Sequence, residues 1–144
     1  MTGRVAAVNI SEKKGQVKKP VDRGVLVKDF GLEGDAHGGS WHRQVSLLAQ
    51  ESIDKMKALG IVGLCTGKFA ENITTEGIAL HTLGVGTRLK AGEAVLEISQ
   101  IGKECHRGCE ILKQVGKCIM PTEGIFARVI EGGEIKPGDK IEVL

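Results

Sequence analysis

The residues best suited to covalent chemistry lie in the segment I-G-K-E-C-H-R-G-C-E, residues 101–110. This segment holds Cys105 and Cys109, with three residues between them. Basic neighbours such as Lys103 and Arg107, and a helix that begins near the second cysteine, would favour the thiolate form. A thiolate attacks sulfane sulfur and binds soft metals. Two thiols in one loop also permit sulfur transfer followed by release as a disulfide.

Two other interpretations of these cysteines remain open. Both side chains could be small buried hydrophobic groups. A structural zinc site could instead use Cys105, His106, Cys109 and Cys118, although the paired knuckles with the usual ligand spacing are absent from the sequence. Cys65 and Cys118 have apolar neighbours, and we expect these two to be structural.

A second candidate segment is the glycine-rich stretch G-D-A-H-G-G at residues 34–39, which Trp41, His42 and Arg43 follow closely. Its glycines let the backbone approach a ligand and expose N–H groups to it. Asp35 and His37 could hydrogen-bond each other or a ligand, and Arg43 could bind a phosphate or carboxylate with two parallel bonds. The stretch matches neither a Walker loop nor a dinucleotide fingerprint. The alternative is a tight turn whose aspartate caps the backbone.

A third candidate is G-K-F-A-E-N-I, residues 67–73, where Glu71 and Asn72 stand at the expected start of a strand. An adjacent carboxylate and amide can bind the edge of a polar heterocycle. They can equally well brace a neighbouring loop, and the sequence does not choose between these two roles.

Short strands separated by glycine turns are the main pattern of the chain, which has 21 glycines and three prolines. Within the strand expected after the Ala91–Gly92–Glu93 turn, apolar residues alternate with Val95, Glu97 and Ser99. Residues 50–59 form the clearest helix, with Ile53, Met56 and Leu59 on one face. The fold class indicated is mainly β, a closed or partly closed barrel with a few short helices. The expected strands are 3–10, 25–28, 43–48, two flanking 91–93, 124–133 and 140–144, with strand character also in 71–77; 31–39 is an expected loop and 109–115 a short helix.

Composition restricts the classes of function. A chain of 144 residues has the typical length of one domain, so we expect a single domain at 1–144. A net charge of +2 with three Phe, one Trp and no Tyr argues against nucleic-acid binding. The absence of a signal segment or a long apolar run predicts a cytoplasmic protein with no membrane association, whose four cysteines are mostly reduced.

The polar stretch at residues 11–19 carries the lysines Lys13, Lys14, Lys18 and Lys19. We expect it to be a solvated loop. The alternative is that one or two of these lysines face an anionic ligand.

The order of these motifs along the chain resembles the MOSC domain family, named after the C-terminal domain of molybdenum cofactor sulfurases. G-L-E-G-D-A-H-G-G is followed by R-Q-V-S-L-L and a helix start E-S-I, then by G-K-F-A-E-N-I-T-T-E-G-I, the cysteine segment, and finally G-I-F-A-R-V-I-E-G-G-E-I-K-P-G-D. The resemblance covers about residues 5–143. It is closest to the stand-alone bacterial type, which has no NifS-like aminotransferase domain.

The resemblance implies a barrel related to the small barrel domain of pyruvate kinase, and a role with the molybdenum cofactor (molybdopterin). By its position after the I-S-Q strand, Cys105 matches the family's cysteine, which would carry sulfur and contact the metal. The short C-x-x-C-like forms of other members would favour Cys109 instead. The positions that match the family's motifs, and so would bind the cofactor, are Asp35, His37, Arg43, Glu71 and Asn72.

The function that the resemblance implies is sulfur transfer to a molybdenum centre through a cysteine persulfide. Such a carrier needs a cysteine desulfurase or other sulfur donor, whose pyridoxal phosphate stays on that partner. It also needs an acceptor, either a molybdenum enzyme or a cofactor-biosynthesis protein. The alternatives are a module that binds and delivers the cofactor without covalent chemistry, and a component of a molybdenum-dependent reductase for N-hydroxylated compounds.

Overall fold

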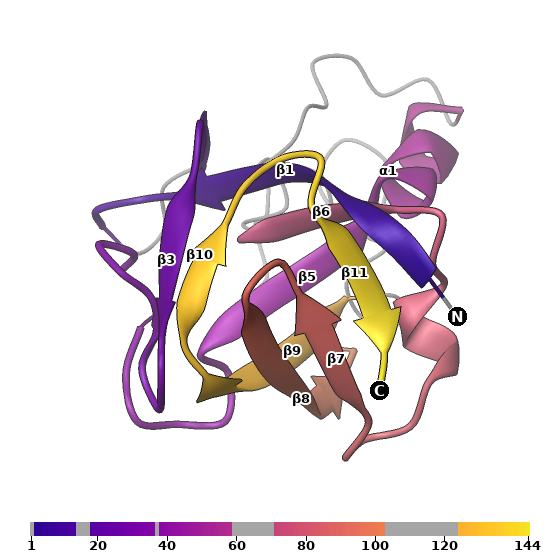
Figure 1. Ribbon diagram of the computed structural model, residues 1–144. Coiled ribbons are helices and arrows are strands. Elements are labelled where there is room, and N and C mark those ends of the chain that lie inside the picture. Colours follow the sequence, from indigo (N-terminus) through magenta and orange to yellow (C-terminus); the bar gives the residue numbers. More distant parts are fainter. Residues whose placement is uncertain (1, 14–17, 37, 59–70, 103–123) are drawn as a thin grey trace.

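A computed structural model of the chain describes residues 2–13, 18–36, 38–58, 71–102 and 124–144 (Figure 1). The described residues are mainly β, with one short α-helix and one 3-10 turn. The elements in chain order are β1 (Thr2–Ile10), β2 (Lys19–Val21), β3 (Gly24–Val27), β4 (Gly31–Leu32), β5 (Val45–Ala49), α1 (Gln50–Lys57), β6 (Ile73–Glu76), η1 (Leu80–Thr82), β7 (Arg88–Ala91), β8 (Ala94–Ile101), β9 (Ile125–Glu131), β10 (Gly133–Ile135) and β11 (Lys140–Val143).

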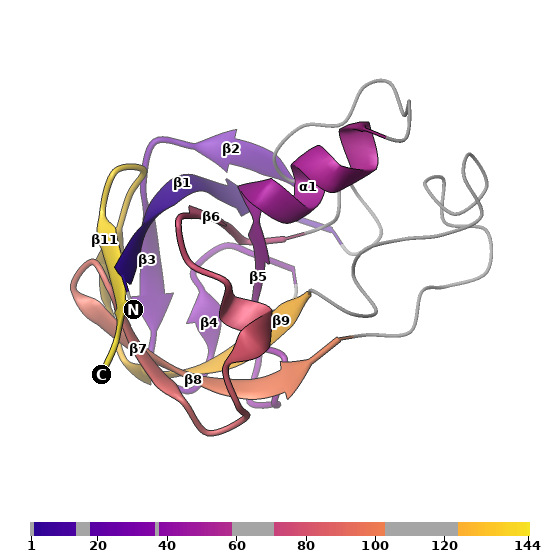
Figure 2. The same ribbon diagram turned by 90° about the vertical axis from the view of Figure 1, so that its right-hand side faces the viewer.

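Seven of the described strands close into a barrel, in the order β11-β7-β8-β9-β5-β6-β1, and β2 adds to the end of this sheet. Antiparallel pairing of β1 with β11, with Gly3 opposite Ile141, completes the ring. The pair β5–β6 is parallel, with Leu47 opposite Ile73. A parallel pair needs a long crossover, and α1 lies on that connection (Figure 2).

The barrel interior is filled by the side chains that alternate inward along each strand. In β8 the buried residues Ala94, Leu96 and Ile98 alternate with partly exposed ones, as the sequence pattern predicts. The residues of the core cluster are Val5, Val8, Leu26, Leu32, Val45, Leu47, Ile73, Ile78, Leu80, Leu89, Ala91, Ala94, Leu96, Ile98, Ile125, Ala127, Val129, Ile135 and Ile141. Because the core uses one face of each strand, the other face is available to build a site.

A second, three-stranded sheet of order β10-β3-β4 lies beside the barrel. It leads into the connection between β4 and β5, which carries the glycine-rich stretch. Gly31 has a φ of +125°, and a side chain there would collide with the carbonyl oxygen of Gln44. Glycine at this position therefore allows the two ends of the connection to pack against each other.

The predicted fold class is confirmed: the described residues form a mainly β, closed barrel. The helix predicted at 50–59 is described over Gln50–Lys57, and its residue Ile53 is fully buried. The expected loop at 31–39 begins with the short strand β4. The short helix expected at 109–115 lies outside the described residues. No described helix has the length and apolar character needed to cross a bilayer.

Replacing a core residue of the barrel should lower its stability. Leu47 is 0% exposed, and Leu47→Ala should reduce the free energy of unfolding by about 2–5 kcal/mol, because the removed methyl groups leave a cavity. Urea denaturation followed by circular dichroism measures the change. Val85→Ala is the control, because Val85 is 65% exposed and its truncation should cost less than about 0.5 kcal/mol. Equal effects of the two substitutions would contradict the described core.

Candidate functional site

A buried ion pair ties the glycine-rich stretch to the polar segment before β2. The Nζ atom of Lys18 lies 2.7 Å from Oδ1 of Asp35, and both side chains are 0% exposed. The same Oδ1 accepts the backbone N–H of Ser11 at 3.0 Å, and Lys18 Nζ donates to Ser11 Oγ at 3.2 Å. The prediction that the lysines of this stretch are solvated is therefore wrong for Lys18. A carboxylate buried at Asp35 requires a compensating cation, and this lysine supplies it.

The surroundings of Asp35 keep its carboxyl group ionised. Burial by itself raises the pKa of Asp35, because it disfavours the charged form. The hydrogen bond and positive charge of Lys18, the N–H of Ser11 and a hydrogen bond from Asn72 act in the opposite direction, and the net pKa is lowered. Asp35 is thus an acceptor of hydrogen bonds rather than a proton donor at neutral pH.

Asn72 links three segments that are distant in sequence. Its Oδ1 accepts the backbone N–H of Ser46 at 3.0 Å, and its Nδ2 donates to the carbonyl oxygen of Asn9 at 3.3 Å. Main-chain bonds to the same two residues, at 2.8 and 2.7 Å, hold its backbone. Together with the bond to Asp35, these contacts join the second and third candidate segments of the sequence. Bracing is the role that these bonds give to Asn72.

Glu71 lies in the same buried polar region. Its side chain is 0% exposed, and its Oε2 accepts the hydroxyl of Thr74 at 2.9 Å. Thr74 in turn accepts Nδ2 of Asn9 at 3.1 Å. The region extends over the outer face of β1, β5 and β6, so the barrel carries a polar network on the side opposite to its core.

Arg43 has a different environment, between two aromatic rings. Its guanidinium carbon lies 5.0 Å from the ring centroid of Trp41 and 5.6 Å from that of Phe126. Such cation–π contacts hold a guanidinium in place without using its N–H donors. The Nε atom is buried and makes no hydrogen bond. Among the described residues no carboxylate forms an ion pair with this arginine. The two rings therefore hold its guanidinium in place while its N–H donors remain available to a ligand.

His42 connects this arginine to the end of β8. Nε2 of His42 lies 2.9 Å from Oε1 of Gln100, and Nε2 of Gln100 donates to the carbonyl oxygen of Gly102 at 2.8 Å. Ser99 Oγ also donates to the carbonyl oxygen of His42. The residues Trp41, His42, Arg43, Gln100 and Phe126 are called the Arg43 rim below.

The Arg43 rim lies at the end of β8 and the start of β9, which supply Gln100 and Phe126. Ile101 pairs with Ile125, and the N–H of Gly102 donates to the carbonyl oxygen of Gly124 at 2.7 Å. Figure 2 shows the end of β8 beside the start of β9 at this place. Sequence reasoning selected Arg43 but not Gln100 or Phe126, because both lie in expected strands and only strand pairing brings them to the site.

The predicted site residues His37, Cys105 and Cys109 lie outside the described residues, as do Cys65 and Cys118, which were expected to be structural. The predicted thiol chemistry, the contact of Cys105 with a metal and the alternative zinc site accordingly remain predictions. Within the described ranges, no three His, Cys, Asp or Glu side chains gather in the manner of metal ligands.

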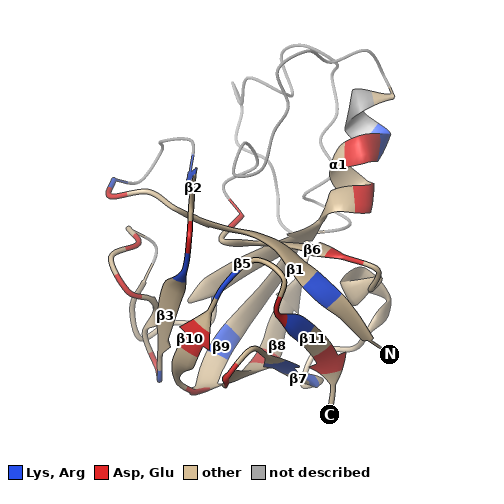
Figure 3. Ribbon diagram, turned by 45° about the horizontal axis from the view of Figure 1, so that its top comes forward, with Lys and Arg blue, Asp and Glu red and all other residues tan. Residues whose placement is uncertain are grey.

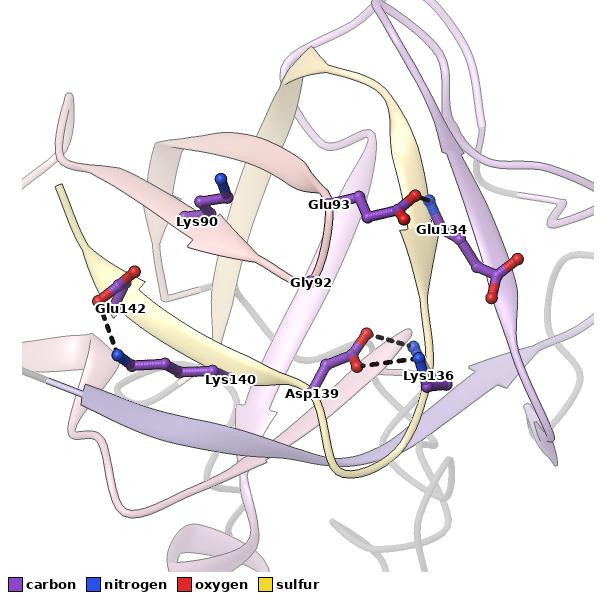
Figure 4. Close-up of a pocket in the computed structure, with 8 residues that line it drawn as sticks. All are labelled: Lys90, Gly92, Glu93, Glu134, Lys136, Asp139, Lys140 and Glu142. Atoms are coloured by element: carbon purple, nitrogen blue, oxygen red, sulfur yellow. Dashed lines mark hydrogen bonds and ion pairs between the residues drawn. The ribbon is translucent and has the colours of Figure 1, made fainter.

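A cavity of about 330 Å³ opens at the other end of β8, between the β7–β8 turn and the loop that joins β10 to β11 (Figure 4). Its charges largely satisfy one another: Asp139 pairs with Lys136 at 3.5 Å and Lys140 with Glu142 at 3.3 Å. Acidic and basic residues are interspersed in the same way over the face seen in Figure 3. Most of the charges that line the cavity are therefore already paired, in contrast to Arg43 at the rim.

A family model described as the MOSC domain matches residues 34–142, which is more than half of the chain. The chain belongs to the MOSC domain family. The family is associated in general with binding of the molybdenum cofactor and with sulfur transfer. The match includes the glycine-rich stretch, the Arg43 rim, the Glu71–Asn72 pair and the cysteine segment.

Similar proteins include the uncharacterized protein YflK of Bacillus subtilis (strain 168), 25% identical over 143 residues. That alignment covers 90% of this chain and 63% of YflK, so the chain spans less than two thirds of the length of that curated relative. The crystal structure of the YUAD protein from Bacillus subtilis aligns with a TM-score of 0.82 at 20% identity, covering 99% of this chain and 96% of that one. YiiM from Geobacillus stearothermophilus aligns with a TM-score of 0.73 at 19% identity, covering 99% and 75% of the two chains. These structural likenesses show that the fold is shared.

The buried ion pair should make the stability of this MOSC protein depend on pH. Because the folded-state pKa of Asp35 is lowered, its carboxylate stabilises the native state above the ordinary pKa of 3.8, and this contribution is lost as the pH falls through the lowered value. Asp35→Asn leaves Lys18 charged and buried without its counter-ion, which should cost about 3–5 kcal/mol at pH 7. The acid-dependent loss of stability should also be shallower in this variant.

Urea denaturation between pH 3 and 7 measures both effects. Asp22→Asn is the matched control, because Asp22 is exposed and its substitution should change little. The double variant Lys18→Met/Asp35→Leu removes both charges and should be more stable than either single variant. If the changes in the free energy of unfolding caused by Lys18→Met and Asp35→Leu simply add in the double variant, the two residues do not form a direct pair.

Proposed function

We propose that this MOSC protein binds the molybdenum cofactor at the Arg43 rim and carries sulfur on a cysteine persulfide. The observation that supports this proposal is Arg43 itself, a cation held between Trp41 and Phe126 with a buried Nε that has no acceptor. A buried donor without a partner is costly, and an oxygen of a bound ligand would remove that cost.

The residues at the rim fit the cofactor, which combines a phosphate with a polar, oxygen-bearing heterocycle. Guanidinium donors match phosphate and carbonyl oxygens, and Arg43 would therefore hold one of these oxygens. Asp35 and Asn72 are engaged with Lys18, Ser46 and Asn9, so they would shape the wall behind the ligand. When bound, the cofactor supplies a molybdenum centre that takes a sulfur ligand.

The sulfur-carrying step belongs to the cysteine segment. Cys105 follows Gly102 by three positions, and Gly102 accepts a hydrogen bond from Gln100 of the rim. In the proposed step, the thiolate of Cys105 attacks the terminal sulfur of a persulfide on the donor protein. A new S–S bond forms as the donor's S–S bond breaks, and the donor leaves as a thiolate. In the release step, the thiolate of Cys109 attacks the inner sulfur of the Cys105 persulfide. The Cys105–Cys109 disulfide forms as the persulfide S–S bond breaks, and the outer sulfur leaves as hydrosulfide.

The proposal requires two partners. A cysteine desulfurase, or another sulfur donor, forms the initial persulfide, and any pyridoxal phosphate belongs to that protein. A molybdenum enzyme or a cofactor-biosynthesis protein receives the product. Non-covalent delivery of the cofactor is the alternative, and the cysteine variants below separate the two functions.

Removing Arg43 should weaken cofactor binding. Charged hydrogen bonds contribute about 1.5–3 kcal/mol, so Arg43→Ala should lower the affinity about 10- to 100-fold. The protein is loaded in a host that makes the cofactor, and retained molybdenum and pterin are measured after gel filtration. Arg88→Ala is the control, because Arg88 is an exposed arginine that pairs with Glu97. Equal retention by the Arg43 variant and the wild type would contradict cofactor binding at this rim.

The cysteine variants test sulfur transfer. After incubation with a cysteine desulfurase and cysteine, intact-protein mass spectrometry should show one added sulfur atom on the wild type. The addition should disappear in Cys105→Ser and persist in Cys65→Ser. An addition lost only in Cys109→Ser would assign the persulfide to Cys109. If no variant and no wild-type protein gains sulfur while the cofactor still binds, the protein is a non-covalent delivery module.

A further inference from the structure

Three polar groups form a directed chain at the Arg43 rim. The side-chain amide of Gln100 lies between His42 and the backbone carbonyl of Gly102, at 2.9 and 2.8 Å. A carbonyl oxygen can only accept, so the Gln100 atom that faces Gly102 is the NH2 group. Its Oε1 consequently faces His42, and the imidazole must donate to it from Nε2.

This arrangement determines which nitrogen of His42 remains available. A neutral imidazole carries one N–H, and when Nε2 holds it, Nδ1 is the acceptor. The His42 side chain is exposed, and its Nδ1 has no hydrogen-bond partner in the described part of the chain. His42 therefore offers an acceptor to a ligand.

The acceptor of His42 lies in the same cluster as the donors of Arg43. The imidazole packs edge-on against Trp41, with ring centroids 5.8 Å apart and an interplanar angle of 70°. The guanidinium of Arg43 lies over the same indole at 5.0 Å. One aromatic ring thus supports both a group that donates and a group that accepts.

We propose that His42 reads the amide edge of the pterin, with Gln100 as its positioning residue. This inference rests on the proposed function and specifies which end of the cofactor the rim holds. At that edge an N–H donor stands next to a carbonyl acceptor. His42 Nδ1 accepts the ring N–H, and Arg43 donates to the neighbouring carbonyl oxygen. Bonds of opposite direction at adjacent atoms select this edge over a phosphate, which offers acceptors only.

Binding of free pterin tests the contact with His42. Titration followed by pterin fluorescence should show that His42→Phe, which keeps an aromatic ring against Trp41, weakens binding about 2- to 10-fold, the value of one hydrogen bond. With 3-methylpterin, which lacks the ring N–H, wild type and His42→Phe should bind equally. Equal weakening of pterin and 3-methylpterin binding in His42→Phe would overturn the inference. Displacement of the bound cofactor by inorganic phosphate but not by pterin would overturn it as well.

The role of Gln100 has its own readout. Nitrogen-15 NMR of the histidine side chains should show His42 as the Nε2–H tautomer in the wild type and in Gln100→Glu, whose carboxylate accepts the same bond. Gln100→Met should give a mixture of tautomers and weaker pterin binding. An Nδ1–H signature for His42 in the wild type would overturn the inference.

The two proposals fail differently. Binding of the intact cofactor that depends on Arg43, with no binding of free pterin, would overturn the inference about His42 and leave the proposed function intact. Absence of any cofactor binding, with the Nε2–H tautomer present, would contradict the proposed function itself.

Discussion

Lys18 and Asp35 are two opposite charges removed from water, and the candidate site depends on their pairing. A buried charge has a high desolvation cost unless its partner is close and well placed. The pair meets this condition at 2.7 Å, and Ser11 bonds both members. Because these residues come from the end of β1, the start of β2 and the glycine-rich stretch, the pair fixes three segments at once. Asn72 extends the same network to β5 and β6.

The polar network and the Arg43 rim have different roles in the candidate site. Most groups in the network bond one another, so their contribution is shape and rigidity; within the described residues, Oδ1 of Asn9 is buried without a hydrogen-bond partner. At the rim, by contrast, Arg43 is held by ring faces, which leaves its donors for a ligand. A small number of precisely placed polar groups is what fixes the orientation of a bound ligand.

The position of the rim follows from the barrel. Antiparallel pairing of β8 with β9 brings Gln100 opposite Phe126, and pairing of β9 with β5 brings Phe126 opposite Ser46. The residues just before β5 are therefore set beside the end of β8. Motifs from separate parts of the chain meet because strand pairing around the closed barrel places the ends of their strands next to one another.

The sequence by itself determined the fold class and most of the strands, because alternating apolar residues and glycine turns are local signals. It also selected Asp35, Arg43, Glu71 and Asn72, whose types are unusual in such a pattern. Only the tertiary structure decided what these residues do. It buried Lys18, which the polar sequence around it had assigned to solvent, and it gave Asn72 a bracing role. It added Gln100 and Phe126 to the site, because contacts between strands depend on register across the barrel and not on neighbours along the chain.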